Sequence, residues 1–108
     1  MNRRYEVYAD AEKFISAWIR DGRPDLNEIA TLVGAWSRSQ FLFDEKVTVY
    51  LRKVWIDAVK ADQAQEIISR QVNGDRKEAI ETSQALLLEH ANYDKLRTVF
   101  LENLNVKS

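Results

Sequence analysis

The single histidine of the chain, His90, is the residue best suited to acid–base chemistry near neutral pH. Asp94 follows four residues later. On a continuous helix the Asp94 carboxylate would lie one turn away, where it could orient the imidazole ring. The alternative is a partly buried histidine near a helix end, hydrogen-bonded to a carbonyl group or to Asp94. We favour this packing role over catalysis.

Other residue types that carry enzyme chemistry are missing or unsuitably spaced. The chain has no cysteine, which excludes thiolate nucleophiles and cysteine-based zinc sites. Neither a calcium-loop spacing, nor G-x-S-x-G, nor a phosphate-binding glycine loop is present. Carboxylate pairs such as Asp57 with Asp62, or Glu78 with Glu81, usually mark the solvated face of a charged helix. We expect no enzyme activity, no metal and no cofactor.

Length and charge restrict the class of protein. A chain of 108 residues forms one domain, here residues 1–108, and its 45% hydrophobic and 31% charged residues are typical of soluble proteins. With 16 basic and 17 acidic residues, no net field attracts nucleic acid. A helix-turn-helix around residues 38–44 is disfavoured because its second helix would begin with Asp44 and Glu45. No apolar run is long enough to span a membrane, so we expect a cytoplasmic location.

Hydrophobic periodicity predicts an all-α, single-domain bundle of four to five helices. The first helix should run from Arg3 to Asp21, where Gly22 ends it. Its expected buried face consists of Val7, Tyr8, Ala11, Phe14, Ile15, Trp18 and Ile19. The second helix should begin at Asp25, which with Glu28 has the spacing of a reciprocal cap, and should continue to about Ser37 with Trp36 facing inward.

The linker after the second helix is unusually apolar, with Phe41, Leu42 and Phe43 in a row. Asp44 is a natural cap for the third helix. We therefore expect Phe41 and Phe43 to be buried as a plug at one end of the core. Gly34, inside the second helix, predicts a close crossing with a neighbouring helix.

The third helix should be the longest, running from residue 44 to 72 and ending near Asn73-Gly74. A second, thinner apolar stripe lies on the side opposite its main buried face. If no helix covers it, this stripe is available to a partner. Trp55 lies near the edge of the main face and adds an aromatic anchor of the kind common in binding surfaces. The predicted partner-binding residues are Val49, Trp55, Ile56 and Ile67.

A fourth helix should begin with a cap at Asp75, and a last amphipathic segment should run from Tyr93 to about Asn105. The helical phase changes around Ala91-Asn92. The sequence leaves open whether this is a kink or a true turn.

Two stretches, RRYEVYADAEKFI and FLFDEKVTVYL, resemble a widespread group of small bacterial proteins of uncharacterised function. That group carries an N-terminal membrane span and a charged stalk before R-x-x-V-Y-x-A-x-x-F-I, and later F-L-F-D-x-x-V-x-x-Y-L. The matching residues are Arg4, Val7, Tyr8, Ala9 or Ala11, Phe14, Ile15, Phe41, Leu42, Phe43, Asp44, Val47, Tyr50 and Leu51. The present sequence contains no span. The resemblance implies that Met1 is an alternative start and that an upstream anchor tethers the domain to the inner face of a bacterial membrane.

These observations favour a non-enzymatic protein–protein interaction module that binds a protein partner, or a second copy of itself, through the third helix. The alternative is a free-standing small helical regulator or inhibitor that masks a partner protein's surface. Neither nucleic acid nor direct membrane binding is expected.

Overall fold

The computed structural model describes residues 3–70 and 76–104, and within these ranges it contains helices and no strand. A short 3₁₀ turn, Leu26–Glu28, precedes the second α-helix. The α-helices are α1 (Arg3–Asp21), α2 (Ile29–Leu42), α3 (Glu45–Arg70), α4 (Arg76–His90) and α5 (Tyr93–Leu104). The expected all-α bundle with a long third helix is confirmed. None of these helices has the length and hydrophobicity needed to cross a membrane.

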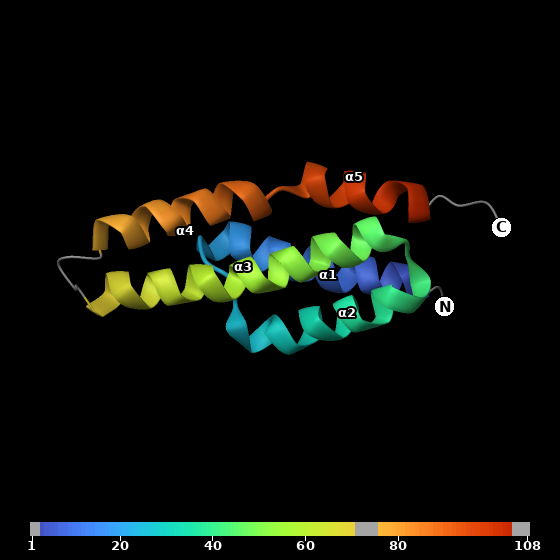
Figure 1. Cartoon of the computed structure of the whole chain (residues 1–108), viewed down its shortest axis with the longest axis horizontal. Coiled ribbons are helices and arrows are strands. Elements are labelled where there is room, and N and C mark those ends of the chain that lie inside the picture. Colours follow the sequence, from blue (N-terminus) through green and yellow to red (C-terminus); the bar gives the residue numbers. More distant parts are fainter. Residues whose placement is uncertain (1–2, 71–75, 105–108) are drawn as a thin grey trace.

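The long helix α3 is the axis of the bundle (Figure 1). Its 26 residues span about 39 Å at 1.5 Å per residue. α4 lies along its C-terminal half and α5 along its N-terminal half, nearly end to end. α2 packs on another side of α3, and α1 packs mainly against α2 and α5. α3 and α4 form the most extensive helix pair, and small buried residues allow their close approach. These small residues are Ala61, Ala64, Ala79 and Ser83.

Residues of α1, α2, α3 and α5 form the core. The fully buried residues of α1 are among those expected from its periodicity, and they include Phe14 and Trp18. Ile19 was expected on the same face but is 41% exposed in the last turn of α1, so its assignment to the buried face is wrong. Phe100 of α5 is 0% exposed and has three aromatic neighbours. Its ring centroid lies 5.3 Å from that of Tyr8, 5.1 Å from that of Phe43 and 6.5 Å from that of Tyr50. Phe100 therefore holds the last helix against the rest of the bundle.

The apolar linker is only partly as expected. α2 continues to Leu42 rather than ending near Ser37, so Phe41 is helical and faces away from buried Ser39. Phe41 is 86% exposed, and the prediction that it plugs the core is wrong. Phe43 packs inward against Phe100, and Leu42 also packs against the core.

The predictions for the helix ends agree better with the structure than those for the apolar linker. Asp44 caps α3 by accepting a hydrogen bond from the Lys46 amide at 3.0 Å. Gly22 ends α1 with a φ of 71°, a left-handed conformation that glycine adopts without strain. The Asp25 side chain accepts from the Asn27 amide at 2.9 Å, not from Glu28, because the chain forms a 3₁₀ turn there.

Other expectations for the helices are wrong or lie outside the described residues. A Cβ atom on Gly34 would meet no heavy atom within 4 Å, so no close helix crossing explains this glycine. Trp36 is only partly buried, because it packs beside Trp55 at the side of the bundle. The expected end of the third helix at residues 73–74, the cap at Asp75 and the end near Asn105 lie outside the described ranges.

The two phenylalanines provide a matched test of this core. Phe100→Ala should lower the free energy of unfolding by about 3–5 kcal/mol, because it removes a ring from a closed aromatic cluster. Phe41→Ala should change it by no more than about 0.5 kcal/mol, since that ring is already in solvent. Urea denaturation followed by circular dichroism measures both values. Equal losses for the two variants would contradict the described packing.

Candidate functional site

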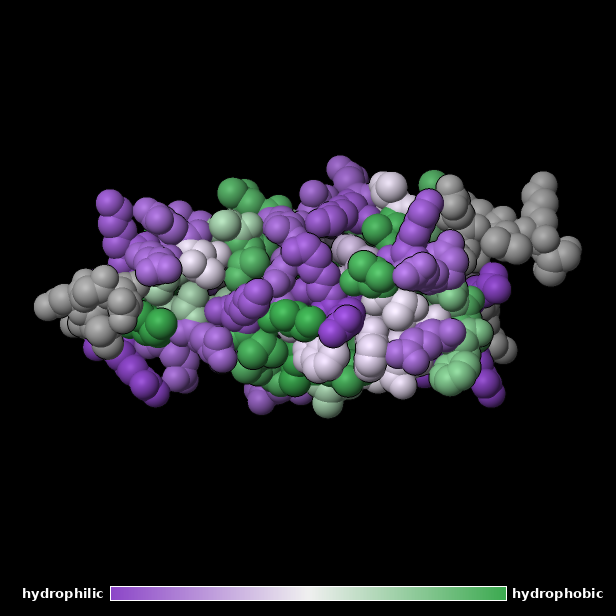
Figure 2. All heavy atoms as spheres, in the orientation of Figure 1, coloured by the Kyte–Doolittle hydropathy of each residue, from purple (hydrophilic) through white to green (hydrophobic). Residues whose placement is uncertain are grey.

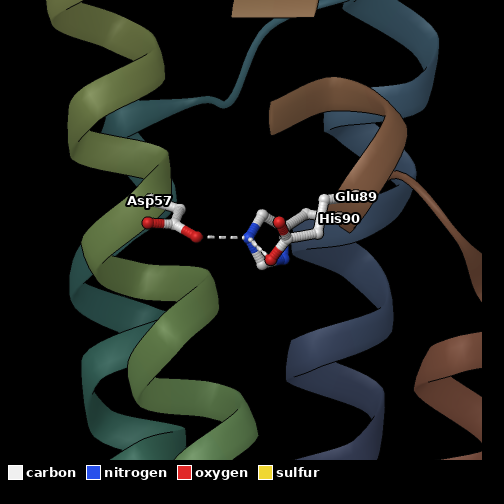
Figure 3. Close-up of side chains that lie close together, drawn as sticks. All are labelled: Asp57, Glu89 and His90. Carbon is white, nitrogen blue, oxygen red and sulfur yellow. Dashed lines mark hydrogen bonds and ion pairs between the residues drawn. The ribbon is translucent and has the colours of Figure 1, made fainter. Parts of the chain in front are cut away.

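His90, the last residue of α4, forms the most unusual polar contact in the described part of the chain. Its side chain is 0% exposed, and its Nε2 atom lies 2.7 Å from Oδ2 of Asp57 and 3.2 Å from Oε2 of Glu89. Figure 3 shows Asp57 reaching from α3 toward the imidazole ring on α4. Nε2 faces two carboxylate oxygens, which can only accept hydrogen bonds. Nε2 must therefore be the protonated nitrogen, and its N–H donates a hydrogen bond to Asp57.

Lys53 brings a positive charge to the same cluster from one turn earlier on α3. Its Nζ atom lies 3.0 Å from Oδ2 of Asp57 and 2.7 Å from Oε2 of Glu89. Lys95 of α5 lies farther off, at 3.9 Å from the same Glu89 oxygen. The cluster therefore links α3, α4 and α5, and each carboxylate has a cationic neighbour.

The other side of the imidazole ring is covered by α1. Trp18 stacks on His90 with ring centroids 5.5 Å apart and an interplanar angle of 28°. The remaining nitrogen, Nδ1, is buried and has no hydrogen-bond partner among the described residues. A buried Nδ1–H would lose its hydration without compensation, which favours the neutral ring.

The electrostatics of the cluster agree with a neutral histidine between ionised carboxylates. Burial lowers the pKa of His90 below its ordinary 6.5, and this outweighs the hydrogen bond to Asp57 and the nearby negative charges, which raise it. Burial acts to raise the pKa of Asp57, but the hydrogen bonds from His90 and Lys53 leave it lower than usual. The hydrogen bond from Lys53 lowers the pKa of Glu89.

The partner of His90 differs from the one expected. The Asp94 side chain is 94% exposed and lies near Arg97, because a turn at residues 91–92 ends α4 before Asp94 can align with the histidine. Asp57 is 5% exposed, so its assignment to a solvated face is also wrong. One signal could have identified it. Asp57 stands midway between Tyr50 and Ala64 at seven-residue spacing, and both of those residues are buried.

His90, Asp57 and Glu89 present ligand atoms within 4.8 Å of one another, the spacing of a metal site. Two features oppose metal binding. The ammonium of Lys53 already lies against both carboxylates, and Nε2 would have to lose its proton to become a ligand. The arrangement is better suited to joining helices than to holding an ion.

The predicted partner-binding residues do not form one surface. Val49 and Ile56 are 56% and 38% exposed on the outer side of α3. Trp55 is half-buried beside Trp36 of α2, with ring centroids 5.5 Å apart. Ile67 is half-buried and faces a hollow lined by α4. Hydrophobic patches on the side of α3 shown in Figure 2 are separated by hydrophilic side chains, so the continuous stripe expected from the sequence is absent there.

A groove between α3 and α5 gathers part of this apolar surface. It has a volume of about 510 Å³, and Val49, Tyr50 and Val99 form its apolar floor. Sequence reasoning missed it because Val99 comes from a helix whose position depends on long-range packing. His90 lines neither this groove nor the hollow beside Ile67.

Comparison with known proteins leaves the family open. The chain matches no protein-family model, no curated protein and no solved structure.

The buried histidine predicts a loss of stability on mild acidification. Because the pKa of His90 is lower in the folded protein, the unfolded chain binds the proton more readily once the pH falls below about 6.5. The free energy of unfolding should therefore decrease from pH 7 to pH 5, by at most about 1.4 kcal/mol per pH unit.

Urea denaturation at several pH values measures this slope. His90→Gln removes the only histidine and should flatten the curve in this window, whatever its effect at pH 7. The His90→Gln variant should still lose stability near pH 4, where Asp57 and Glu89 become protonated. A wild-type protein that becomes more stable from pH 7 to pH 5 would show that the carboxylates hold His90 in its charged form.

Added metal should not stabilise the wild-type protein. An ion bound at about 100 times its dissociation constant would raise the free energy of unfolding by about 2.7 kcal/mol. We expect no such increase with Zn²⁺ or Mn²⁺ in thermal denaturation, because the Lys53 ammonium occupies the position of a cation. Lys53→Met removes that ammonium group, so added metal should stabilise this variant more than it stabilises the wild type. Clear stabilisation of the wild type would overturn this interpretation.

Proposed function

We propose that the protein is a non-enzymatic protein–protein interaction module that binds its partner through the outer side of α3. The observation that carries this proposal is the exposure of Val49 and Ile56 on the longest helix, together with the apolar groove beside Val49. Two exposed branched side chains alone are ordinary for a soluble protein. Val49 also lines the apolar groove beside α5, and this supports a binding role for the surface.

The inaccessibility of the polar cluster supports a non-enzymatic role. His90 is covered by Trp18 on one side and by Asp57 and Glu89 on the other, and its side chain has no exposed surface. A substrate would have to displace Trp18 or Lys53 to reach the imidazole. The contacts that the cluster makes between helices explain its presence without a catalytic role.

A location on the inner face of a bacterial membrane, through a tether that precedes the described residues, is part of the same proposal. It rests on the sequence resemblance alone. Recognition of a partner through α3 does not require it.

The proposal is tested by affinity capture from the cells that express the protein, using wild type and single substitutions. Val49→Asp and Ile56→Asp should each reduce recovery of the specific partner about tenfold or more, because each places a charge in an apolar contact. Leu88→Asp is the matched control, since Leu88 is 80% exposed but lies at the end of α4.

All three variants should keep the wild-type circular dichroism spectrum and stay within about 0.5 kcal/mol of its stability, because the changed residues are exposed. Unchanged capture by both α3 variants would contradict the proposal. Loss of capture only with Leu88→Asp would move the contact to the end of α4.

A further inference from the structure

The groove between α3 and α5 combines an apolar floor with a mostly basic rim. Lys46 and Lys53 of α3 and Lys95 of α5 line it together with one carboxylate, that of Glu45. On the apolar floor, Tyr50 is only 7% exposed, whereas Val49 is 56% exposed. The groove therefore offers an apolar surface and positive charges, which a partner with apolar and acidic side chains could match.

The cluster around His90 fixes the basic rim in place. Glu89 lies 2.7 Å from Lys53 and 3.9 Å from Lys95, so two cations from different helices converge on one side of the groove, where Glu89 and Asp57 balance part of their charge. Lys46, one turn before Tyr50, makes no ion pair within residues 3–70 and 76–101. Its positive charge is available to an incoming carboxylate.

Charge disfavours one arrangement of a second copy of the chain, the antiparallel pairing of two α3 helices across Ile56. The outer side of α3 also carries Arg52 and Lys60, both exposed and equally spaced about Ile56. Two α3 helices that pair antiparallel across Ile56 would bring Arg52 of each copy against Lys60 of the other. Like charges in such contact oppose association and leave a partner of opposite charge as the better match.

The groove is shallow, and a bilayer could also contact Val49 and the lysine ammonium groups, so vesicle binding is one of the outcomes tested below. Tyr50, on the floor of the groove, is only 7% exposed. A helix with apolar residues on one face can reach that floor and place its flanking side chains against the rim.

We propose that the groove between α3 and α5 binds an amphipathic helix of a partner protein, with apolar residues toward Val49, Tyr50 and Val99 and with Asp or Glu beside the lysine rim. This inference rests on the proposed interaction function and names the chemistry of the partner. The recognition mode is that of a helix in a groove, with opposite charges fixing its orientation.

The first experiment uses a defined probe in place of the unknown partner. The probe is a capped synthetic helix of about 18 residues with leucines on one face and glutamates beside them. A second peptide has every glutamate replaced by lysine. Titration into ¹⁵N-labelled protein at about 50 mM salt should shift amide signals of residues 45–53 and 95–100 with the acidic peptide only.

Substitutions separate the apolar from the charged contribution. Lys46→Glu combined with Lys95→Glu should weaken binding of the acidic peptide about tenfold or more and should allow binding of the basic one. Val49→Asp should weaken binding of the acidic peptide to the otherwise wild-type protein and binding of the basic peptide to the charge-reversed double variant. Leu88→Asp should change neither. Equal binding of the two peptides to wild type, or signal shifts confined to other surfaces, would overturn the proposal.

Other occupants give different results, each of which contradicts the acidic-helix proposal. Dimerisation that Val49→Asp abolishes, measured by light scattering, would assign the groove to a second copy. Flotation with vesicles containing anionic phospholipid, without response to either peptide, would assign it to a membrane.

The captured partner distinguishes this inference from the proposed function. If Val49→Asp abolishes capture but the double charge reversal leaves it unchanged, the interaction surface is correct and the acidic partner is wrong. If neither changes capture, both fail.

Discussion

The hydrogen bond from His90 to Asp57 is the contact on which the position of the C-terminal helices depends. It joins the last residue of α4 to the middle of α3, and Trp18 of α1 covers it. The turn to α5 follows at once, where the Asn92 side chain accepts from the Lys95 amide at 3.1 Å. Fixing His90 therefore fixes where α5 begins, and α5 then carries Phe100 into the core.

Lys53 connects this buried contact to the surface. The same ammonium group lies against Asp57 and Glu89 and lines the groove beside Val49. The polar cluster thus joins α3, α4 and α5 and also orders the rim of the candidate docking site. A cluster built for chemistry would need an open path to His90, whereas this one reaches the surface through Lys53, Glu89 and Lys95, and the imidazole itself is buried.

The sequence predicted much of what depends on neighbouring residues, including the buried face of α1 apart from Ile19, the Asp44 cap and a change of helical phase at residues 91–92. It failed where contacts between distant segments decide the outcome. His90 and Asp57 are 33 residues apart, and no local pattern pairs them. Phe41 was misplaced because α2 continues past Ser37 and turns that ring outward. The groove escaped notice because its walls come from α3 and α5, which meet only through tertiary packing.

The protonation of the His90 ring tests this account most directly. Two-dimensional ¹⁵N NMR of the imidazole at pH 7 distinguishes the charged ring from each neutral tautomer. The account predicts a neutral ring that carries its proton on Nε2, with that proton protected from exchange by burial between α1, α3 and α4. A ring protonated on both nitrogens, or one whose Nε2 proton exchanges at the rate of a surface histidine, would contradict it.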